Sequence, residues 1–358
     1  MNGLVRLHSR MPLRPLYGHE GLRRRLAGAI ASGRLPQAIL FEGPRGVGKQ
    51  RLALWLAQSV LCEGPRDGAE PCGSCQPCKL VLTLSHPDVH WIVPVEVARK
   101  GADADKQVDL AEAALAEEMA ARREQPLYQA ASGLVSHGIA SARLLSRQLR
   151  LTPAMARHKL FLVGDAERLA VQRANPEAAN ALLKALEEPP ADTVIVLTSS
   201  EPEALLPTIL SRVVRIRVGR LPDSVVTQFV QRELGVTEQR VLEQRVVSSE
   251  GSIGRLLAEG TNRAAGSAVE AMLTAARRTP ADRYALALGQ PPFQARGAFT
   301  ALLDDLLERL RTEARAGRET QAVVAAMARV LDARELAQGN VNPQLLAAVL
   351  VEDLWSTA

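Results

Sequence analysis

A glycine-rich loop that ends in a lysine is the first feature of this sequence that could take part in chemistry. The segment GPRGVGKQ contains Gly43, Gly46, Gly48 and Lys49, and it lies between an apolar run and a helical pattern. Glycines allow backbone N–H groups to wrap around a phosphate at a helix N-terminus, and the lysine adds positive charge there. The alternative is a chance glycine turn, but such a turn need not lie between a strand and a helix. We therefore predict a nucleotide-phosphate site.

Two residues that should hold the magnesium ion of such a site are replaced. Gln50 follows the lysine, where the motif has a Ser or Thr whose hydroxyl binds the metal. After the apolar segment LFLV, Gly164 stands where a metal-binding Asp is usual, and Asp165 stands where the water-activating Glu would be. Both changes affect the same ion. We therefore expect a degenerate ATPase site that binds ATP or ADP weakly, or holds the nucleotide without hydrolysing it.

The four cysteines of the chain lie close together and predict a metal site. Nine residues separate Cys62 from Cys72, and two residues separate each of the next pairs, Cys72–Cys75 and Cys75–Cys78. The short spacings allow adjacent thiolates to converge on one tetrahedral Zn²⁺, while the longer loop brings in the fourth ligand. Four protein ligands leave no position for water, so we predict a structural zinc knuckle at residues 62–78. Four unlinked thiols are the alternative.

Composition limits the compartment and the partners. The chain has 358 residues, 47% of them hydrophobic but only 3% aromatic, and a formal net charge of +5. No apolar run is long enough for a membrane span, and residues 1–14 lack the continuous apolar stretch of a signal peptide. We expect a cytoplasmic chain without a membrane partner, in which thiols stay reduced. The mild basicity fits contact with nucleic acid, and equally an arginine-rich surface.

Hydrophobic periodicity predicts the elements that position these residues. Strands and helices alternate up to about residue 220, which favours a parallel α/β sheet covered by helices. The predicted strands are residues 37–41, 89–93, 159–163, 193–198 and 213–218. Only helical patterns follow, so the expected fold is α/β followed by all-α, with domains at 1–220, 221–262 and 263–358. The stretch at 96–137 is rich in Ala, Asp and Glu, and we expect an exposed insertion there, either a solvated helix or a partly disordered segment.

Several segments, in their order along the chain, resemble one protein family. The phosphate loop and the cysteines are followed by His86-Pro87-Asp88, then by NALLKALEEPP at residues 180–190, then by Ser211-Arg212-Val213. In this order they resemble the AAA+ clamp-loader subunits of bacterial DNA polymerase III, the delta-prime subunits in particular. The resemblance covers about the first 220 residues, and the segment 180–190, which the gamma/tau motor subunits share, is its most specific part.

The resemblance implies an architecture and a set of partners. It implies an AAA+ phosphate-loop domain with a five-stranded parallel sheet, a small helical lid, and a C-terminal helical collar through which subunits assemble into a hetero-pentameric ring. The implied partners are the gamma/tau and delta subunits, the sliding clamp, and primed DNA contacted through its backbone. Arg212 matches an arginine that the family places in a neighbour's ATP site, although Val213 replaces the usual Cys. An intradomain or surface salt bridge is the alternative for Arg212.

Three departures from the motor subunits favour a non-motor role. Gln50 and Gly164 are two of them, and the third is the lid stretch GSIGR, in which Gly254 takes the place of the expected arginine. The leading hypothesis is a stator-like subunit of the DNA polymerase III holoenzyme that donates Arg212 to a neighbour's ATP, with its own ATPase absent or weak. Because Lys49 is retained, the alternative is an active ATPase, either gamma/tau-like or another AAA+ protein. A zinc-dependent nucleic-acid-binding module is a third hypothesis.

Overall fold

The structure is a computed structural model, which describes residues 13–64, 68, 70–95, 104–124, 137–169, 177–261, 263–290, 299–315, 321–337 and 341–356. The chain forms two compact units, one ending at Leu257 and the other beginning at Ala258. The predicted division into three domains, with a first boundary at residue 220, stays a prediction. Within the described ranges no helix has both the length and the apolar character needed to cross a bilayer.

The first unit is built on a five-stranded parallel sheet, as predicted. Its strands are β1 (Ala38–Glu42), β2 (Val89–Ile92), β3 (Lys159–Val163), β4 (Thr193–Ser199) and β5 (Val214–Arg217). The strands lie in the order β2-β3-β4-β1-β5, and every neighbouring pair is parallel. The phosphate loop therefore leaves the carboxyl end of β1, between β4 and β5. Open α/β sheets bind ligands at that edge.

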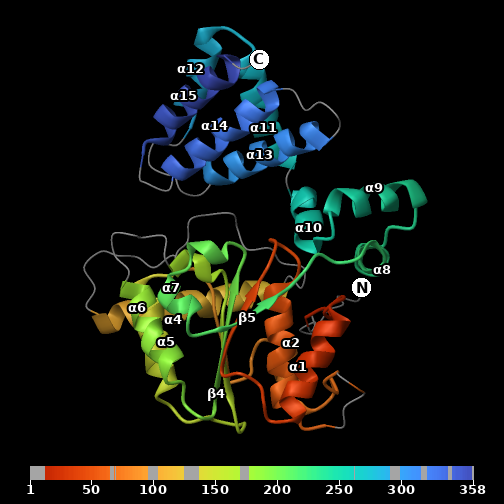
Figure 1. The fold of residues 1–358 in the computed structure, drawn as a ribbon, viewed down its shortest axis with the longest axis vertical. Coiled ribbons are helices and arrows are strands. Elements are labelled where there is room, and N and C mark those ends of the chain that lie inside the picture. The colour runs from red at the N-terminus through yellow and green to blue at the C-terminus, as the bar shows by residue number, and fades with distance from the viewer. Residues whose placement is uncertain are drawn as a thin grey trace, which may run out of the picture. The chain divides into compact units, whose positions relative to one another are not determined.

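Helices cover both faces of the sheet (Figure 1). One layer contains α1 (Glu20–Ala31), α2 (Lys49–Leu61) and α3 (Gln76–Leu82), and the other contains α4 (Ala104–Glu124), α5 (Ile139–Leu149) and α6 (Glu177–Glu187). Successive side chains of a strand point to opposite faces, so Leu40 and Phe161 pack in one core while Phe41 and Leu162 pack in the other. Strands that are apolar on both faces are thus explained by burial on both sides.

Helix α4 corrects one expectation from the sequence. The segment 96–137 was expected to be exposed, but α4 buries Val108, Ala111 and Leu115 on the sheet side. Their spacing of three and four residues places them on one narrow apolar stripe of the helix. The stripe is hard to recognise in the sequence because most of the other apolar residues of α4 are alanines. Arg147 of α5 also forms ion pairs with Asp109 (3.1 Å) and with a second acid of α4. Residues 96–103 and 125–136 lie outside the described residues.

The remaining elements are helical, as predicted for an all-α part. Short turns η1 (Ala166–Leu169), η2 (Pro202–Ala204) and α7 (Pro207–Leu210) follow β3 and β4. Helices α8 (Asp223–Leu234), α9 (Gln239–Ser249) and α10 (Ile253–Thr261) share an apolar cluster of their own, centred on Val226 and Phe229. The second unit contains α11 (Arg263–Ala276), α12 (Pro280–Leu288), α13 (Thr300–Arg315), α14 (Gln321–Ala337) and α15 (Pro343–Ser356). Its core contains Phe299, Leu303 and Val330.

Candidate functional site

The phosphate loop has the wrapped backbone that its glycines predict. Gly46 and Gly48 have φ angles of 77° and 100°, in the left-handed region that glycine adopts without steric cost. Helix α2 begins directly after the loop, at Lys49, so its N-terminus faces the space that the loop encloses. On the other side, Nε2 of His19 lies 2.8 Å from the carbonyl oxygen of Val47. The loop therefore has both the conformation and the helix terminus of a phosphate site.

The lysine of the loop is satisfied by the protein itself. Its side chain is buried, and Nζ donates hydrogen bonds to the carbonyl oxygens of Gly43 and Pro44, both at 2.8 Å, and to Oγ of Ser200 at 2.9 Å. Burial lowers the pKa of Lys49 to about 8, and the negative charge of Glu167 opposes that shift. The ammonium group must leave these acceptors before it can reach a phosphate.

The lid stretch lies directly on the phosphate loop. The backbone N–H of Gly254 donates to the carbonyl oxygen of Gly46 at 2.9 Å. A Cβ atom at Gly254 would lie 2.5 Å from Cα of Gly46, which no packing rearrangement of side chains could relieve. The glycine that stands in place of the expected lid arginine is therefore required by this contact. Arg255, one residue later, instead forms an ion pair with Glu250 at 3.1 Å.

The two replaced metal-binding positions face one another. A Cβ atom added at Gly164 would lie 2.9–3.1 Å from the amide atoms of Gln50, so the amide fills the space beside the glycine. Nη1 of Arg122, from α4, lies 3.4 Å from Oε1 of Gln50, and the Arg122 guanidinium stacks over the Trp91 ring at 4.3 Å. Neither an amide nor a guanidinium is a Mg²⁺ ligand of the usual kind. These residues do not fit a magnesium ion.

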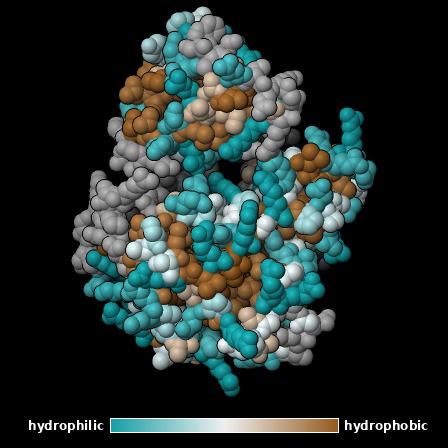
Figure 2. Space-filling view, viewed as in Figure 1, coloured by the Kyte–Doolittle hydropathy of each residue, from teal (hydrophilic) through white to brown (hydrophobic). Residues whose placement is uncertain are grey.

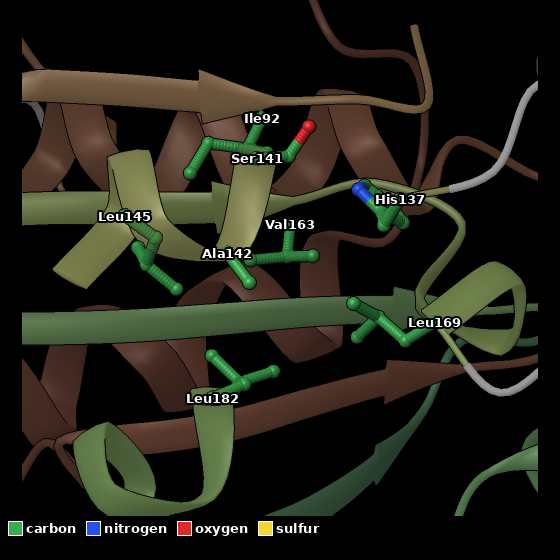
Figure 3. A pocket seen from close by; sticks show the side chains of 8 residues that line it. All are labelled: Ile92, His137, Ser141, Ala142, Leu145, Val163, Leu169 and Leu182. Atoms are coloured by element: carbon green, nitrogen blue, oxygen red, sulfur yellow. The ribbon is translucent and has the colours of Figure 1, made fainter. Parts of the chain in front are cut away.

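A buried histidine at the end of the inserted segment 96–137 contacts the turn that contains Gly164. Nε2 of His137 lies 2.7 Å from the carbonyl oxygen of Gly164. Burial lowers the pKa of His137 to about 4, so at neutral pH the ring is uncharged, and its Nε2–H donates because a carbonyl can only accept. Figure 3 shows the ring beside an apolar space bordered by Leu145 and Leu182. The space has a volume of about 10 Å³, enough for no more than one water.

The acidic turn after β3 holds one residue that the motif comparison did not single out. Asp165 has a φ of 51°, in the left-handed region, and its N–H donates to Oγ1 of Thr198 at 3.2 Å. Glu167, two residues later, turns back so that its Oε1 accepts from the N–H of Ser200 at 3.3 Å. Burial raises the pKa of the Glu167 carboxyl. The spacing of two acids after an apolar strand was the available signal for Glu167.

Arg212 lies away from this loop and is paired within the chain. Its Nε and Nη2 donate to Oε1 of Glu187 at 2.9 Å and 2.5 Å, and its Nη1 donates to the carbonyl oxygen of Thr208 at 2.8 Å. The side chain of Arg212 is 32% exposed. The intradomain salt bridge that the sequence left as an alternative is therefore present in the single chain. It does not exclude a contact with a second molecule, because part of the side chain stays accessible.

The four cysteines converge as a metal site requires. The Sγ atoms of Cys62, Cys72, Cys75 and Cys78 all lie within 4.8 Å of one another, and those of Cys72 and Cys78 are 3.9 Å apart. Tetrahedral zinc–sulfur bonds of about 2.3 Å place neighbouring sulfurs about 3.8 Å apart. Backbone N–H groups donate to two sulfurs, and the bond from Cys75 is the main cause that lowers the pKa of Cys72 to about 5. This donor set fits a metal ion bound by thiolates.

Comparisons with known proteins identify the family of this chain. Residues 18–222, more than half of the chain, match the family model described as DNA polymerase III, delta subunit. The chain is 34% identical to DNA polymerase III subunit delta-prime of Bacillus subtilis over 241 residues, which are 67% of this chain and 55% of that protein. It is 27% identical to subunit gamma/tau of Mycobacterium tuberculosis over 339 residues, 94% of this chain and 47% of that protein.

A solved structure gives a weaker likeness. A DNA polymerase III gamma subunit-related protein from Thermotoga maritima shares 18% identity with a TM-score of 0.45, covering 94% of this chain and 99% of that one. Because that score is low, we assign the AAA+ fold from this chain's own sheet order and phosphate loop. The chain spans about half the length of the curated relatives it matches. From the family model and the delta-prime relatives, the chain belongs to the DNA polymerase III delta-subunit family, among its delta-prime members.

Proposed function

We propose that this chain is a non-motor, stator-like subunit of the DNA polymerase III clamp loader, which helps load the sliding clamp onto primed DNA without hydrolysing ATP itself. The observation that carries the proposal is the contact between Gln50 and Gly164. A working site needs a hydroxyl and a carboxylate at these two positions to hold Mg²⁺. Here an amide lies against a glycine, so the metal that neutralises the developing charge would lack both of these ligands.

The surroundings of the phosphate loop support a fixed role. Lys49 is held by the loop's own carbonyl oxygens, and Gly254 of the lid donates to Gly46. Nucleotide-driven motion in a motor subunit would require these bonds to break in each cycle. We infer that ATP or ADP binds here weakly or not at all, and that the lid keeps one position on the loop.

The catalytic contribution of the chain would be made in trans. The Arg212 side chain is partly accessible, and its guanidinium is suited to stabilise charge on a phosphoryl group that a neighbouring subunit transfers. In this proposal Arg212 lies beside ATP held by a gamma/tau subunit. Contacts with primed DNA would be made to the phosphate backbone, which carries no sequence information.

The cysteine site is proposed to hold a structural zinc ion. Four thiolate ligands complete a tetrahedral shell, so the bound ion would have no position for water or substrate. Its chemistry would be to fix the segment 62–78 in place. Cys78 lies in α3, three residues before Val81, which packs in the same core as the apolar residues of α2. The ion would therefore anchor the segment 62–78 to the layer of helices that covers this face of the sheet.

Assembly is proposed to use the helical second unit. Four large apolar side chains of α12 and α15 are exposed, namely Tyr284, Leu288, Leu345 and Val349. Figure 2 shows hydrophobic residues gathered over this part of the unit. Apolar surface of this kind is typical of contacts between subunits. The proposed assembly is a hetero-pentamer with gamma/tau and delta subunits, which together engage the sliding clamp.

An active ATPase similar to gamma/tau is the second candidate. One observation favours it, which is that Lys49 and the loop glycines are intact. The distinction lies in whether Lys49 contributes to turnover in the assembled loader.

Replacing Lys49 with alanine in this subunit tests the two candidates. We expect the ATP turnover of the reconstituted loader to change by less than about twofold, because this chain's loop holds no magnesium-bound nucleotide. The matched control is the same substitution in the phosphate-loop lysine of the gamma/tau subunit, which should abolish most turnover. A comparable loss from Lys49→Ala, in a complex that still assembles, would establish the active ATPase instead.

A further inference from the structure

The backbone around Arg212 is fixed by a short helix. The N–H of Arg212 donates to the carbonyl oxygen of Ile209 at 3.0 Å, at the end of α7 and two residues before β5 begins. Nη1 of the same residue donates to the carbonyl oxygen of Thr208 at 2.8 Å and to Oγ of Ser211 at 3.2 Å. One end of the guanidinium is therefore held by the turn from which the side chain itself emerges.

The other contacts of the guanidinium come from the last residue of α6. Oε1 of Glu187 accepts from Nε and Nη2 of Arg212 at 2.9 Å and 2.5 Å. Helix α6 ends at Glu187 because Pro189 and Pro190 cannot continue it. The carbonyl oxygen of Pro190 accepts from Nε2 of Gln37 at 2.8 Å, beside the start of β1. The sheet thereby fixes the position from which the Glu187 carboxylate extends.

Stability does not explain an acid at this position. The C-terminus of a helix carries a partial negative charge, so a carboxylate in its last turn is unfavourable unless a cation compensates it. The side chains of Glu187 and Arg212 are 47% and 32% exposed, and ion pairs with that exposure contribute little to folding. What the pair does provide is a single orientation for the guanidinium plane.

We propose that Glu187 is a positioning residue for Arg212, an inference that rests on the proposed role of Arg212 at a neighbour's ATP. A guanidinium is a rigid planar fork with five N–H groups. Bonds from Nε and Nη2 to Glu187 occupy its side edge, and a second N–H of Nη2, on the end edge, has no acceptor in the described part of the chain. That N–H of Nη2 is the donor left to meet a phosphate oxygen.

The carboxylate acts by removing freedom that the arginine would otherwise lose in the transition state. A long side chain that must be ordered during the reaction lowers the rate, whereas one that is already oriented does not. The expected effect is therefore on kcat, with little change in the KM for ATP, because ATP is bound by the neighbouring subunit.

The test is ATP hydrolysis at the site that this chain completes, measured as one single-turnover phase of the reconstituted loader that contains this chain as Glu187→Gln. We expect kcat at that site to fall about tenfold at unchanged KM, which corresponds to the ordering of one long side chain. The matched control is Glu188→Gln, one residue along, which should leave kcat unchanged. Combining Glu187→Gln with Arg212→Ala should be no slower than Arg212→Ala alone, since a positioning residue acts only through the arginine.

The outcomes separate this inference from the function on which it rests. If Arg212→Ala slows turnover while Glu187→Gln leaves kcat unchanged, the positioning role is wrong and the role of Arg212 stands. A rise in kcat for Glu187→Gln would also overturn it, because the carboxylate would then restrain the arginine. If Arg212→Ala has no effect, the proposed role of Arg212 fails, and the inference fails with it. Thermal unfolding of the Glu187→Gln chain should match that of the wild type.

Discussion

Replacing Arg212 with alanine is expected to slow ATP hydrolysis at the loader site that this chain completes by about 10³-fold, the effect of removing an arginine that contacts a transferred phosphoryl group. Hydrolysis at other sites of the complex would continue, so single-turnover measurements of ATP hydrolysis should show the loss of one phase. The isolated chain should fold normally, because the Arg212–Glu187 pair is partly exposed and contributes little to stability.

Arg215 provides the matched control for this experiment. It lies three residues further along, on β5, its side chain is 46% exposed, and it forms an ion pair with Glu42 at 2.7 Å. Arg215→Ala therefore removes a similar partly exposed charge nearby in the sequence without changing the residue assigned to the neighbour's ATP. Equal losses from the two variants would mean that general surface charge is responsible, which would contradict a specific role for Arg212.

Replacing Cys78 with serine is expected to abolish the proposed zinc binding and to lower the thermal midpoint of unfolding by more than about 10 °C. Binding of structural zinc to a thiolate site contributes on the order of 10 kcal/mol in small zinc-dependent folds, so even part of it shifts the midpoint strongly. Cys78 is completely buried in α3, and it connects the cysteine segment to the core beneath. Metal content by atomic emission and unfolding by circular dichroism measure the two effects.

The control for the cysteine substitution is Lys79→Ala, because Lys79 is the next residue of α3 and is exposed. It should retain zinc and unfold at the wild-type temperature. Wild-type stability of a zinc-free Cys78→Ser chain would contradict a structural role for the ion. Loss of DNA affinity with the fold intact would instead favour the zinc-dependent nucleic-acid-binding module.

Local sequence patterns predicted the sheet, and they drew attention to two unusual positions of the predicted nucleotide site. Strands such as β3 and β4 are apolar on both faces, and that pattern requires cover on both sides. Gln50 and Gly164 could be recognised as replaced metal ligands because the phosphate-loop motif fixes the residue types at those positions. The clustering of four cysteines likewise required only their spacing.

The contacts that explain the site could not be predicted, because they join residues far apart in sequence. Nothing local in α4 indicates that Arg122 approaches Gln50, or that a stripe as narrow as Val108 and Leu115 is buried. The need for glycine at position 254 becomes visible only when the lid is seen against Gly46. Each of these contacts depends on how separate elements pack, and a single sequence does not record packing.

Steady-state ATP turnover by the purified chain alone shows whether this chain has a magnesium-dependent ATPase of its own. The assay compares Mg²⁺ with EDTA, in the presence and absence of primed DNA, and includes Lys49→Ala. We expect no magnesium-dependent turnover above the rate of Lys49→Ala under any of these conditions. Magnesium-dependent turnover that Lys49→Ala abolishes would contradict the account, and the chain would then be a motor subunit despite Gln50 and Gly164.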